Sequence, residues 1–295
     1  MGLLKKLLVL IVVLSVLYSG FVFYEKKGTS RGVVVLASDD PASIASALVL
    51  VARYDGKLVK FQAGKFDGEI ASEVLSLSPE EVFFVGEEPL VPSGYSERLA
   101  GKGIKVTSLV GRDRFETSKA AFDRLDDRSI EKRDVYIVNG WNEGLILDTL
   151  SRDPQALVLL VDPHHEDLVN AIHERTTLSN KIAGASSGGY GRSVYVDPTL
   201  FNGGNPPCNC TPIRIDEKKI ASLSIERLEN LSNTISDQGT LAQVKEKIAA
   251  AKEMLSEGDF ENAEITAEEG LQIAYQTISG EQIGPAESKE KENKG

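Results

Sequence analysis

Two arginines and two aspartates occupy positions from which an α/β protein could contact a ligand. Arg112 and Arg114 fall between an expected strand and an expected helix, where backbone N–H groups also attract anions. Asp39 and Asp40 follow the first apolar run, and ligands of α/β proteins often bind where strands end. All four are candidate ligand-binding residues, with phosphate or carboxylate expected at the arginines. Structural alternatives stay open, because Arg114 could pair with Glu116 or another acid and the aspartates could cap a helix.

The two cysteines and three histidines are the other residues with ligand chemistry. Cys208 and Cys210 form a Cys-Asn-Cys triplet, which an oxidising compartment would allow to close into a small disulfide loop. A plain turn explains the same triplet, and two thiols rarely suffice for a metal. His164, His165 and His173 lie near several acids, but they lack the His-Glu-x-x-His spacing. We therefore expect no metal site.

The chain carries no signature of catalysis or of cofactor binding. The glycine-rich stretch at residues 186–191 lacks the Lys-Ser/Thr ending of a phosphate loop. No nucleophile stands in a recognisable elbow, and no catalytic triad can be assigned. We therefore expect no cofactor and no catalytic residue, and a binding role is favoured over an enzyme.

Short apolar runs that alternate with helical periodicity predict the elements that position these residues. Strands are expected at residues 33–37, 58–61, 82–86, 104–109, 135–138, 157–161 and 193–196. Helices are expected between them, the first opening at Pro41, and another after Asp162-Pro163. Apolar strands of this kind suit parallel sheets that are buried on both faces. The predicted fold class for residues 28–200 is therefore α/β, with parallel-sheet repeats and flanking helices.

The first 27 residues predict a membrane anchor or a signal segment. Residues 7–24 contain no charge, and at ~1.5 Å per residue they nearly cross a bilayer core of ~30 Å. A cleaved signal peptide wants a shorter apolar stretch and small residues at its cleavage site. We therefore expect a single-pass transmembrane helix at the cell membrane, with the bulk of the chain extracellular.

After residue 200 the composition changes. Residues 201–215 are rich in Gly and Pro and predict a linker. Apolar stripes over residues 216–279 predict a helical bundle, and residues 280–295 predict a disordered tail. Residues 214–295 hold 10 basic and 17 acidic residues, so a net −7 of the chain's −11 falls there. The acidic balance argues against a general nucleic-acid binder.

The segment from Val82 to Ala121 resembles a known repeat. Its signature residues match those of the cell wall-binding repeat 2 family at Gly111, Asp113, Arg114, Phe115, Glu116 and Thr117, with Phe in place of Tyr and Ser108 in place of a leading Arg. The resemblance covers residues 33–200 as about one and a half repeats. It implies an extracellular α/β domain that binds anionic cell-envelope polymers non-covalently. Residues 251–274 resemble a tetratricopeptide-like hairpin, which would suit interaction or oligomerisation.

These features favour a membrane-anchored envelope protein whose external α/β domain binds a surface polymer or a surface protein. Homo-oligomerisation is left open. An envelope-associated hydrolase is one alternative, and a deep cleft with a strongly perturbed carboxylate would favour it. A scaffold that docks partners through the helical module is another, and an exposed apolar stripe would favour it. A shallow groove with exposed Arg would favour polymer binding.

Overall fold

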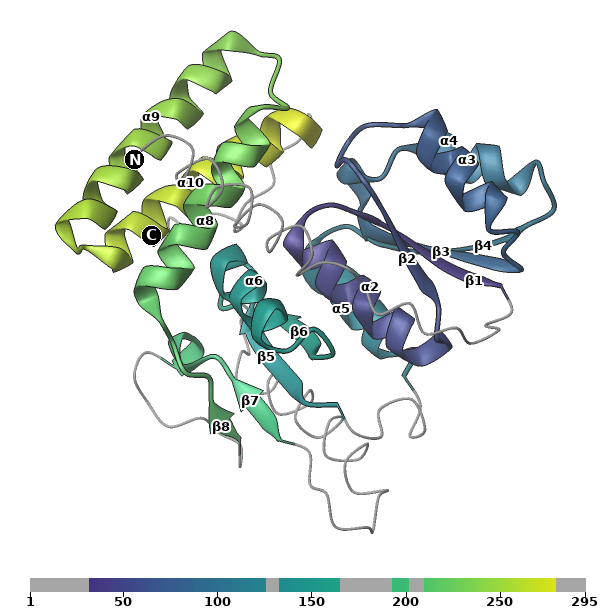
Figure 1. The fold of residues 1–295 in the computed structure, drawn as a ribbon, viewed down its shortest axis with the longest axis horizontal. Coiled ribbons are helices and arrows are strands. Elements are labelled where there is room, and N and C mark those ends of the chain that lie inside the picture. The colour runs from purple at the N-terminus through teal and green to yellow at the C-terminus, as the bar shows by residue number, and fades with distance from the viewer. Residues whose placement is uncertain (1–31, 126–132, 165–192, 202–209, 280–295) are drawn as a thin grey trace, which may run out of the picture. The chain divides into compact units, whose positions relative to one another are not determined.

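The structure is a computed structural model that describes residues 32–125, 133–164, 193–201 and 210–279 (Figure 1). Within those ranges no helix combines the length and the apolar character needed to cross a membrane. The expected anchor, most of the expected helix after Asp162, Cys208 and the expected disordered tail lie outside the described residues. The membrane anchor therefore stays a prediction.

The first sheet has four parallel strands in the order β2-β1-β3-β4. The strands are β1 (Val33–Ser38), β2 (Lys57–Phe61), β3 (Glu81–Glu87) and β4 (Lys105–Gly111). Side chains of β1 and β3 alternate between two faces, and nearly all of them are buried, because both strands are central. The strands match the predicted apolar runs to within one or two residues.

Four helices cover this sheet. They are α2 (Pro41–Tyr54), α3 (Gly68–Ser76), α4 (Ser93–Ala100) and α5 (Arg114–Phe122). Asp40, Asp67 and Asp113 start three of them, since each side chain accepts a hydrogen bond from a backbone N–H of the first turn. Helices α3 and α4 pack on one face of the sheet, and α2 and α5 pack on the other.

The second sheet also has four parallel strands, in the order β6-β5-β7-β8. The strands are β5 (Val135–Asn139), β6 (Leu157–Val161), β7 (Val194–Val196) and β8 (Thr211–Pro212), and α6 (Glu143–Arg152) follows β5. Strands β5 to β7 match predicted runs, whereas β8 forms inside the stretch expected to be a linker. Two parallel sheets flanked by helices confirm the predicted α/β class.

Helices α2 and α5 lie between the two sheets. Phe122 of α5 shares one core with Val85 of the first sheet and Leu159 of the second. Strand β6 is an edge strand, and its Leu160 N–H donates a hydrogen bond of 3.0 Å to Oγ of Ser118 in α5. The Ser118 hydroxyl therefore satisfies one backbone N–H group of this edge strand, which could otherwise pair with a strand of another chain.

Three long helices end the described part of the chain: α8 (Glu217–Ser232), α9 (Gln238–Glu257) and α10 (Phe260–Ser279). Their apolar stripes meet in one core that includes Leu228, Val244 and Leu271, as the periodicity predicted. Gly258 ends α9 at φ 86°, a conformation that favours glycine, and α10 runs back beside α9 (Figure 1).

Helices α8 and α10 also pack on the α/β part of the molecule. Ala63 and Leu90, which follow β2 and β3, belong to the same core as α8, α9 and α10. Gly144 of α6 has no room for a side chain, because a Cβ there would lie 2.5 Å from the carbonyl oxygen of Ile220 in α8. The C-terminal helices therefore cover the carboxyl ends of strands from the first sheet.

Candidate functional site

Asp39 and Asp40 lie at the carboxyl end of β1, as the sequence predicted. Asp40 is fully buried and caps α2 by accepting a hydrogen bond of 2.8 Å from the N–H of Ser43. Oδ1 of Asp39 accepts a hydrogen bond of 3.1 Å from the N–H of Ala63. Both carboxylates are thus engaged by protein groups, and their role toward a ligand stays a prediction.

Arg114, at the start of α5, is buried with only 3% of its surface exposed. Its Nε lies 3.2 Å from Oε1 of Glu87, and its Nη1 lies 3.3 Å from Oε1 of Glu143. Nη1 also donates a hydrogen bond of 3.0 Å to the carbonyl oxygen of Gly140, and the guanidinium sits 4.9 Å from the centre of the Trp141 ring. Arg114 therefore connects the end of β3 to the segment that follows β5.

Tyr275 and Arg227 extend these contacts into the C-terminal helices. The Tyr275 hydroxyl donates a hydrogen bond of 3.2 Å to Oε2 of Glu143 and accepts one of 3.0 Å from Nη2 of Arg227. Arg227 also lies 3.8 Å from carboxylate oxygens of Glu143 and Asp39. We call these contacts the buried ionic network. Its buried or mostly buried members are Glu87, Arg114, Glu143, Arg227 and Tyr275, and Asp39 joins it from the edge with 38% of its side chain exposed. The network joins strand ends of the first sheet to α5, α6, α8 and α10.

Burial and charge act against each other in the buried ionic network. Burial raises the pKa of Glu87 to about 7, although attraction to Arg114 opposes the rise. Burial likewise raises the pKa of Glu143. Burial acts to lower the pKa of Arg114, but attraction to Glu87 and Glu143 outweighs it and raises that pKa above its ordinary value. The arginine is therefore always charged, and its partners are held near it by that charge.

A second group of carboxylates consists of Glu264 and Glu268 in α10 and Asp197 after β7. Oε1 of Glu264 accepts a hydrogen bond of 2.6 Å from Nδ2 of Asn142, the residue that caps α6. Burial raises the pKa of Glu264 to about 7 and raises the pKa of Glu268 well above its ordinary value. Asp197, which follows β7 and is fully buried, also has a raised pKa because of its burial.

Arg112 does not join Arg114. Its side chain is 81% exposed and pairs with Glu116, to which Nε donates a hydrogen bond of 2.8 Å. Glu116 also accepts a hydrogen bond of 3.0 Å from the N–H of Arg112, and these bonds from Arg112 lower the pKa of Glu116. The pairing that the sequence offered for Arg114 and Glu116 is thus made by Arg112 instead, and Arg114 pairs with other acids.

The signature residues around Arg114 each make a structural contact. Oγ1 of Thr117 donates a hydrogen bond of 2.8 Å to the carbonyl oxygen of Gly86 and accepts one of 3.0 Å from the N–H of Gly111. A Cβ at Gly111 would lie 2.6 Å from the backbone nitrogen of Thr117, so only glycine fits. Phe115 meets Trp141 edge to face, with ring centres 5.3 Å apart. The motif therefore fixes the turn from β4 into α5.

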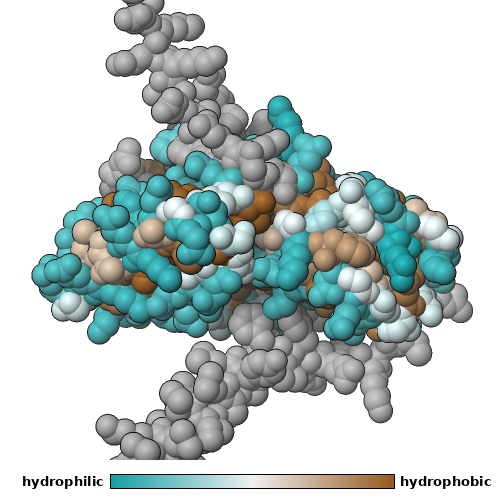
Figure 2. All heavy atoms as spheres, turned by 90° about the horizontal axis from the view of Figure 1, so that it is seen from above, coloured by the Kyte–Doolittle hydropathy of each residue, from teal (hydrophilic) through white to brown (hydrophobic). Residues whose placement is uncertain are grey.

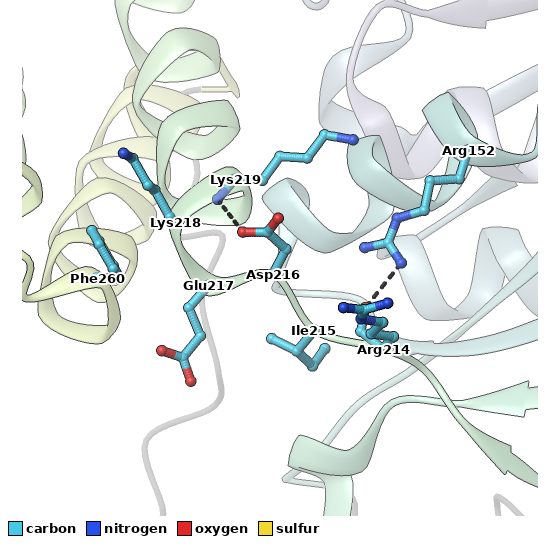
Figure 3. A pocket seen from close by; sticks show the side chains of 8 residues that line it. All are labelled: Arg152, Arg214, Ile215, Asp216, Glu217, Lys218, Lys219 and Phe260. Atoms are coloured by element: carbon cyan, nitrogen blue, oxygen red, sulfur yellow. Dashed lines mark hydrogen bonds between the residues drawn. The ribbon is translucent and has the colours of Figure 1, made fainter.

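A cavity of about 530 Å³ that is open to solvent, which we call the basic pocket, lies where α6, α8 and α10 approach the segment after β8 (Figure 3). Four cationic residues line it: Arg152, Arg214, Lys218 and Lys219. Ile215 and Phe260 add apolar surface, with Phe260 and Lys218 on one side of the pocket and Ile215 and Arg214 on the other. Asp216 and Glu217 are its two acidic residues.

The cations of the basic pocket are not equivalent. Arg152 and Lys219 both pair with the fully buried Asp148, from which Nζ of Lys219 lies 2.6 Å. Asp216 is used in capping α8, because it accepts a hydrogen bond of 3.1 Å from the N–H of Lys219. The exposed side chains of Arg214 and Lys218 have no acidic partner within the described ranges. Within the described part of the chain, no carboxylate neutralises these two charges.

The described residues hold no group of three or more His, Cys, Asp or Glu that could bind a metal ion. Cys210 is part of a disulfide bond, and Cys208 lies outside the described residues. Of the three histidines, only His164 lies inside them. The predictions made on the other two histidines and on the glycine-rich stretch at residues 186–191 therefore stay untested.

Several residues of these sites were not predicted. Glu87 ends a strand and Glu143 stands in the first turn of a helix, where acids usually serve the helix dipole. Tyr275 lies next to the predicted apolar stripe of α10, and Arg227 lies next to Leu228 in the predicted apolar stripe of α8. The sequence feature that could have indicated these residues is a charged or hydroxyl-bearing side chain adjacent to the apolar positions of its strand or helix.

The chain was compared with known proteins, and no family model matches it. Over 114 residues it is 28% identical to the Uncharacterized protein MJ0755 of Methanocaldococcus jannaschii, and the match covers 39% of this chain and 32% of that protein. Among solved structures, Cwp8 from Clostridium difficile is similar with a TM-score of 0.45 and 15% sequence identity, over 78% of this chain and 40% of that one. The chain thus matches less than half the length of either protein, and the resemblance to the wall-binding repeat family stays a prediction.

Proposed function

We propose that the chain is a cell-envelope protein that binds an anionic surface polymer non-covalently through the basic pocket. One observation carries the proposal: the pocket is open to solvent and places the exposed Arg214 and Lys218, which have no acidic partner among the described residues, beside the apolar side chains of Ile215 and Phe260. Cations suit phosphate or carboxylate groups, and an apolar side chain suits the face of a sugar ring. An anionic glycan offers both kinds of surface.

The state of the perturbed carboxylates supports binding over hydrolysis. Glu87 and Glu143 are held by Arg114, Glu264 is held by Asn142, and Oε1 of Glu268, unpaired among the described residues, is buried away from solvent. A general acid needs to reach the substrate atom that it protonates. In contrast, the residues of the basic pocket are mostly exposed to solvent.

The surface of the C-terminal helices gives less support to a scaffold. Among the described residues the exposed large apolar side chains are Phe66, Leu77 and Ile265, and only Ile265 belongs to α8, α9 or α10. Hydrophilic residues predominate on the face shown in Figure 2, with apolar residues showing between them. A protein partner that docks on a helix face usually needs a larger continuous apolar area.

For the location we propose a single membrane anchor at residues 7–24 and an extracellular position for the rest of the chain. The uncharged stretch of 18 residues supports the anchor. The disulfide at Cys210 supports an oxidising compartment, where such bonds persist.

Co-sedimentation tests the proposed function. The full-length chain in mild detergent is mixed with isolated envelope material and pelleted at about 50 mM and about 500 mM salt, which changes the screening of exposed charges. We expect the protein in the pellet at low salt and much less of it at high salt. Failure to pellet at either salt concentration would refute polymer binding. Equal amounts of pelleted protein at the two salt concentrations would refute binding through charged groups.

A further inference from the structure

Helix α10 presents two glutamates to the α/β part of the molecule. Glu264 and Glu268 are four residues apart, so they lie one above the other on the same face of the helix. Oε1 of Glu264 is held by Asn142, whereas Oε1 of Glu268 is buried and has no hydrogen-bond partner in the part of the chain that the structure describes. An unpaired carboxylate oxygen in such a position is costly when it carries charge.

The groups around Glu268 are mostly acidic. Glu264 faces it from its own helix, Glu143 from α6 and Asp197 from the end of β7, and Arg114 is the cation among them. Arg114 is already paired with both Glu87 and Glu143. It cannot neutralise two further carboxylates, so these acids cannot all be ionised without repulsion.

The surroundings of Glu264 are acidic as well. Asp197, Glu217 at the start of α8 and Glu261 on α10 all act on it, and its close partner is the neutral amide of Asn142. Lys247 of α9 forms an ion pair of 2.5 Å with Glu269, another acid of α10. Its charge is therefore already matched by a carboxylate other than Glu264 or Glu268. Burial therefore favours the protonated form of both glutamates, in agreement with the raised pKa values of Glu264 and Glu268.

We propose that Glu264 and Glu268 form a proton-dependent latch that holds α10 on the carboxyl ends of the sheets. When both are protonated, α10 stays docked, Glu264 keeps its hydrogen bond with Asn142, and Glu268 lies near Glu143 without repulsion between them. When both are ionised, they repel Glu143 and Asp197, and α10 separates from the α/β part. The latch goes beyond polymer binding, and its test needs no ligand.

The direction of the pH effect follows from the protons bound in each state. A released α10 exposes its glutamates, which then have ordinary pKa values near 4.5, whereas the docked Glu264 has a pKa of about 7. Between these values the docked state binds more protons, so a rise in pH weakens docking by up to about tenfold per pH unit for one fully coupled group. Glu268, with its strongly raised pKa, continues the effect to higher pH.

Hydrogen exchange on the full-length chain tests the latch. Protection of the α10 amides is measured from pH 5 to pH 8, corrected for the intrinsic pH dependence of exchange, and compared with the first-sheet strands. We expect opening of α10 to rise at least about tenfold over this range. The Glu264→Gln/Glu268→Gln variant keeps neutral side chains of the same shape, so its α10 should stay protected at pH 8.

The matched control removes two exposed glutamates of α9, as Glu253→Gln/Glu257→Gln, and should behave like the unchanged chain. Constant protection of α10 in the unchanged chain would overturn the latch, whatever the variants do. A Gln variant that opens with pH as the unchanged chain does would also overturn it. If the double variant fails to fold by circular dichroism, Glu268→Gln alone should reduce the pH effect, and an undiminished effect counts against the latch.

Discussion

The hydroxyl of Tyr275 in α10 donates a hydrogen bond of 3.2 Å to Oε2 of Glu143 in α6, although 132 positions separate the two residues. Both residues are almost fully buried. The same hydroxyl accepts a hydrogen bond from Arg227 in α8, so three helices meet at one oxygen atom. This contact explains how the C-terminal helices are held on the α/β part of the molecule.

Replacing Tyr275 with Phe should destabilise the protein. The change removes one hydroxyl and leaves Glu143 and Arg227 each short of a buried partner. Loss of a buried hydrogen-bond partner of charged groups costs about 1–3 kcal/mol. Urea unfolding of the full-length chain in detergent measures the change in the free energy of unfolding.

Tyr195→Phe is the control for that variant. Tyr195 stacks on Tyr136 with ring centres 4.8 Å apart, and its hydroxyl makes no hydrogen bond to the described residues. Its loss should change stability by less than about 0.5 kcal/mol. Equal effects of the two variants would show that the hydroxyl of Tyr275 contributes nothing specific.

Arg114→Met should destabilise the protein far more than Arg112→Ala, although the two arginines are only two positions apart. The first change leaves Glu87 buried without its cation and leaves Glu143 with the more distant Arg227, which costs about 3–5 kcal/mol. The second breaks an exposed pair with Glu116, which is worth about 0–1 kcal/mol. Thermal or urea unfolding distinguishes the two, and similar losses would contradict the assignment of Arg114 to the interior.

Adding Glu87→Leu to Arg114→Met should recover part of the lost stability. The double variant removes one stranded carboxylate along with its cation, and buried ion pairs can often be replaced by apolar side chains without loss. The measured quantity is the difference in unfolding free energy between the single and double variants. A double variant no more stable than Arg114→Met would contradict the pairing.

Gly144→Ala should separate α6 from α8. Its new Cβ would lie 2.5 Å from the carbonyl oxygen of Ile220, which is too close, so one helix has to shift at a cost of about 1–3 kcal/mol. Gly68→Ala is the control, because nothing lies within 4 Å of a Cβ at the start of α3. The control should leave stability unchanged or raise it by up to about 1 kcal/mol. A loss in the control as large as in Gly144→Ala would rule out the close approach as the cause.

The sequence predicted the strands well because their signal is local. Residues 82–86 and 157–161 are continuous apolar runs, and Asp40 and Asp113 stand at helix starts as capping requires. Strand β8 was not predicted, because its two residues, one of them Pro212, are too few to show an alternating apolar pattern. The strand is defined by its pairing with β7.

The site was harder to predict because burial of a charge depends on distant elements. Arg112 and Arg114 look alike in sequence, yet one is exposed and the other is enclosed by Glu87 and Glu143 from separate parts of the chain. Lys218 likewise gives no sign in the sequence that it borders a pocket with Arg214 and Phe260. Only the packing of α6, α8 and α10 brings these residues together.

The affinity of the Arg214→Ala/Lys218→Ala variant for isolated envelope polymer tests polymer binding at the basic pocket most directly. The control, Arg98→Ala/Lys245→Ala, removes one exposed Arg and one exposed Lys away from the pocket, so the net charge of the two variants is equal. We predict that the pocket variant binds about 5- to 30-fold more weakly in a co-sedimentation titration, as expected for two lost charge contacts of about 0.5–1 kcal/mol each, while the control binds like the unchanged chain. Equal affinity of the two folded variants would contradict binding at the basic pocket.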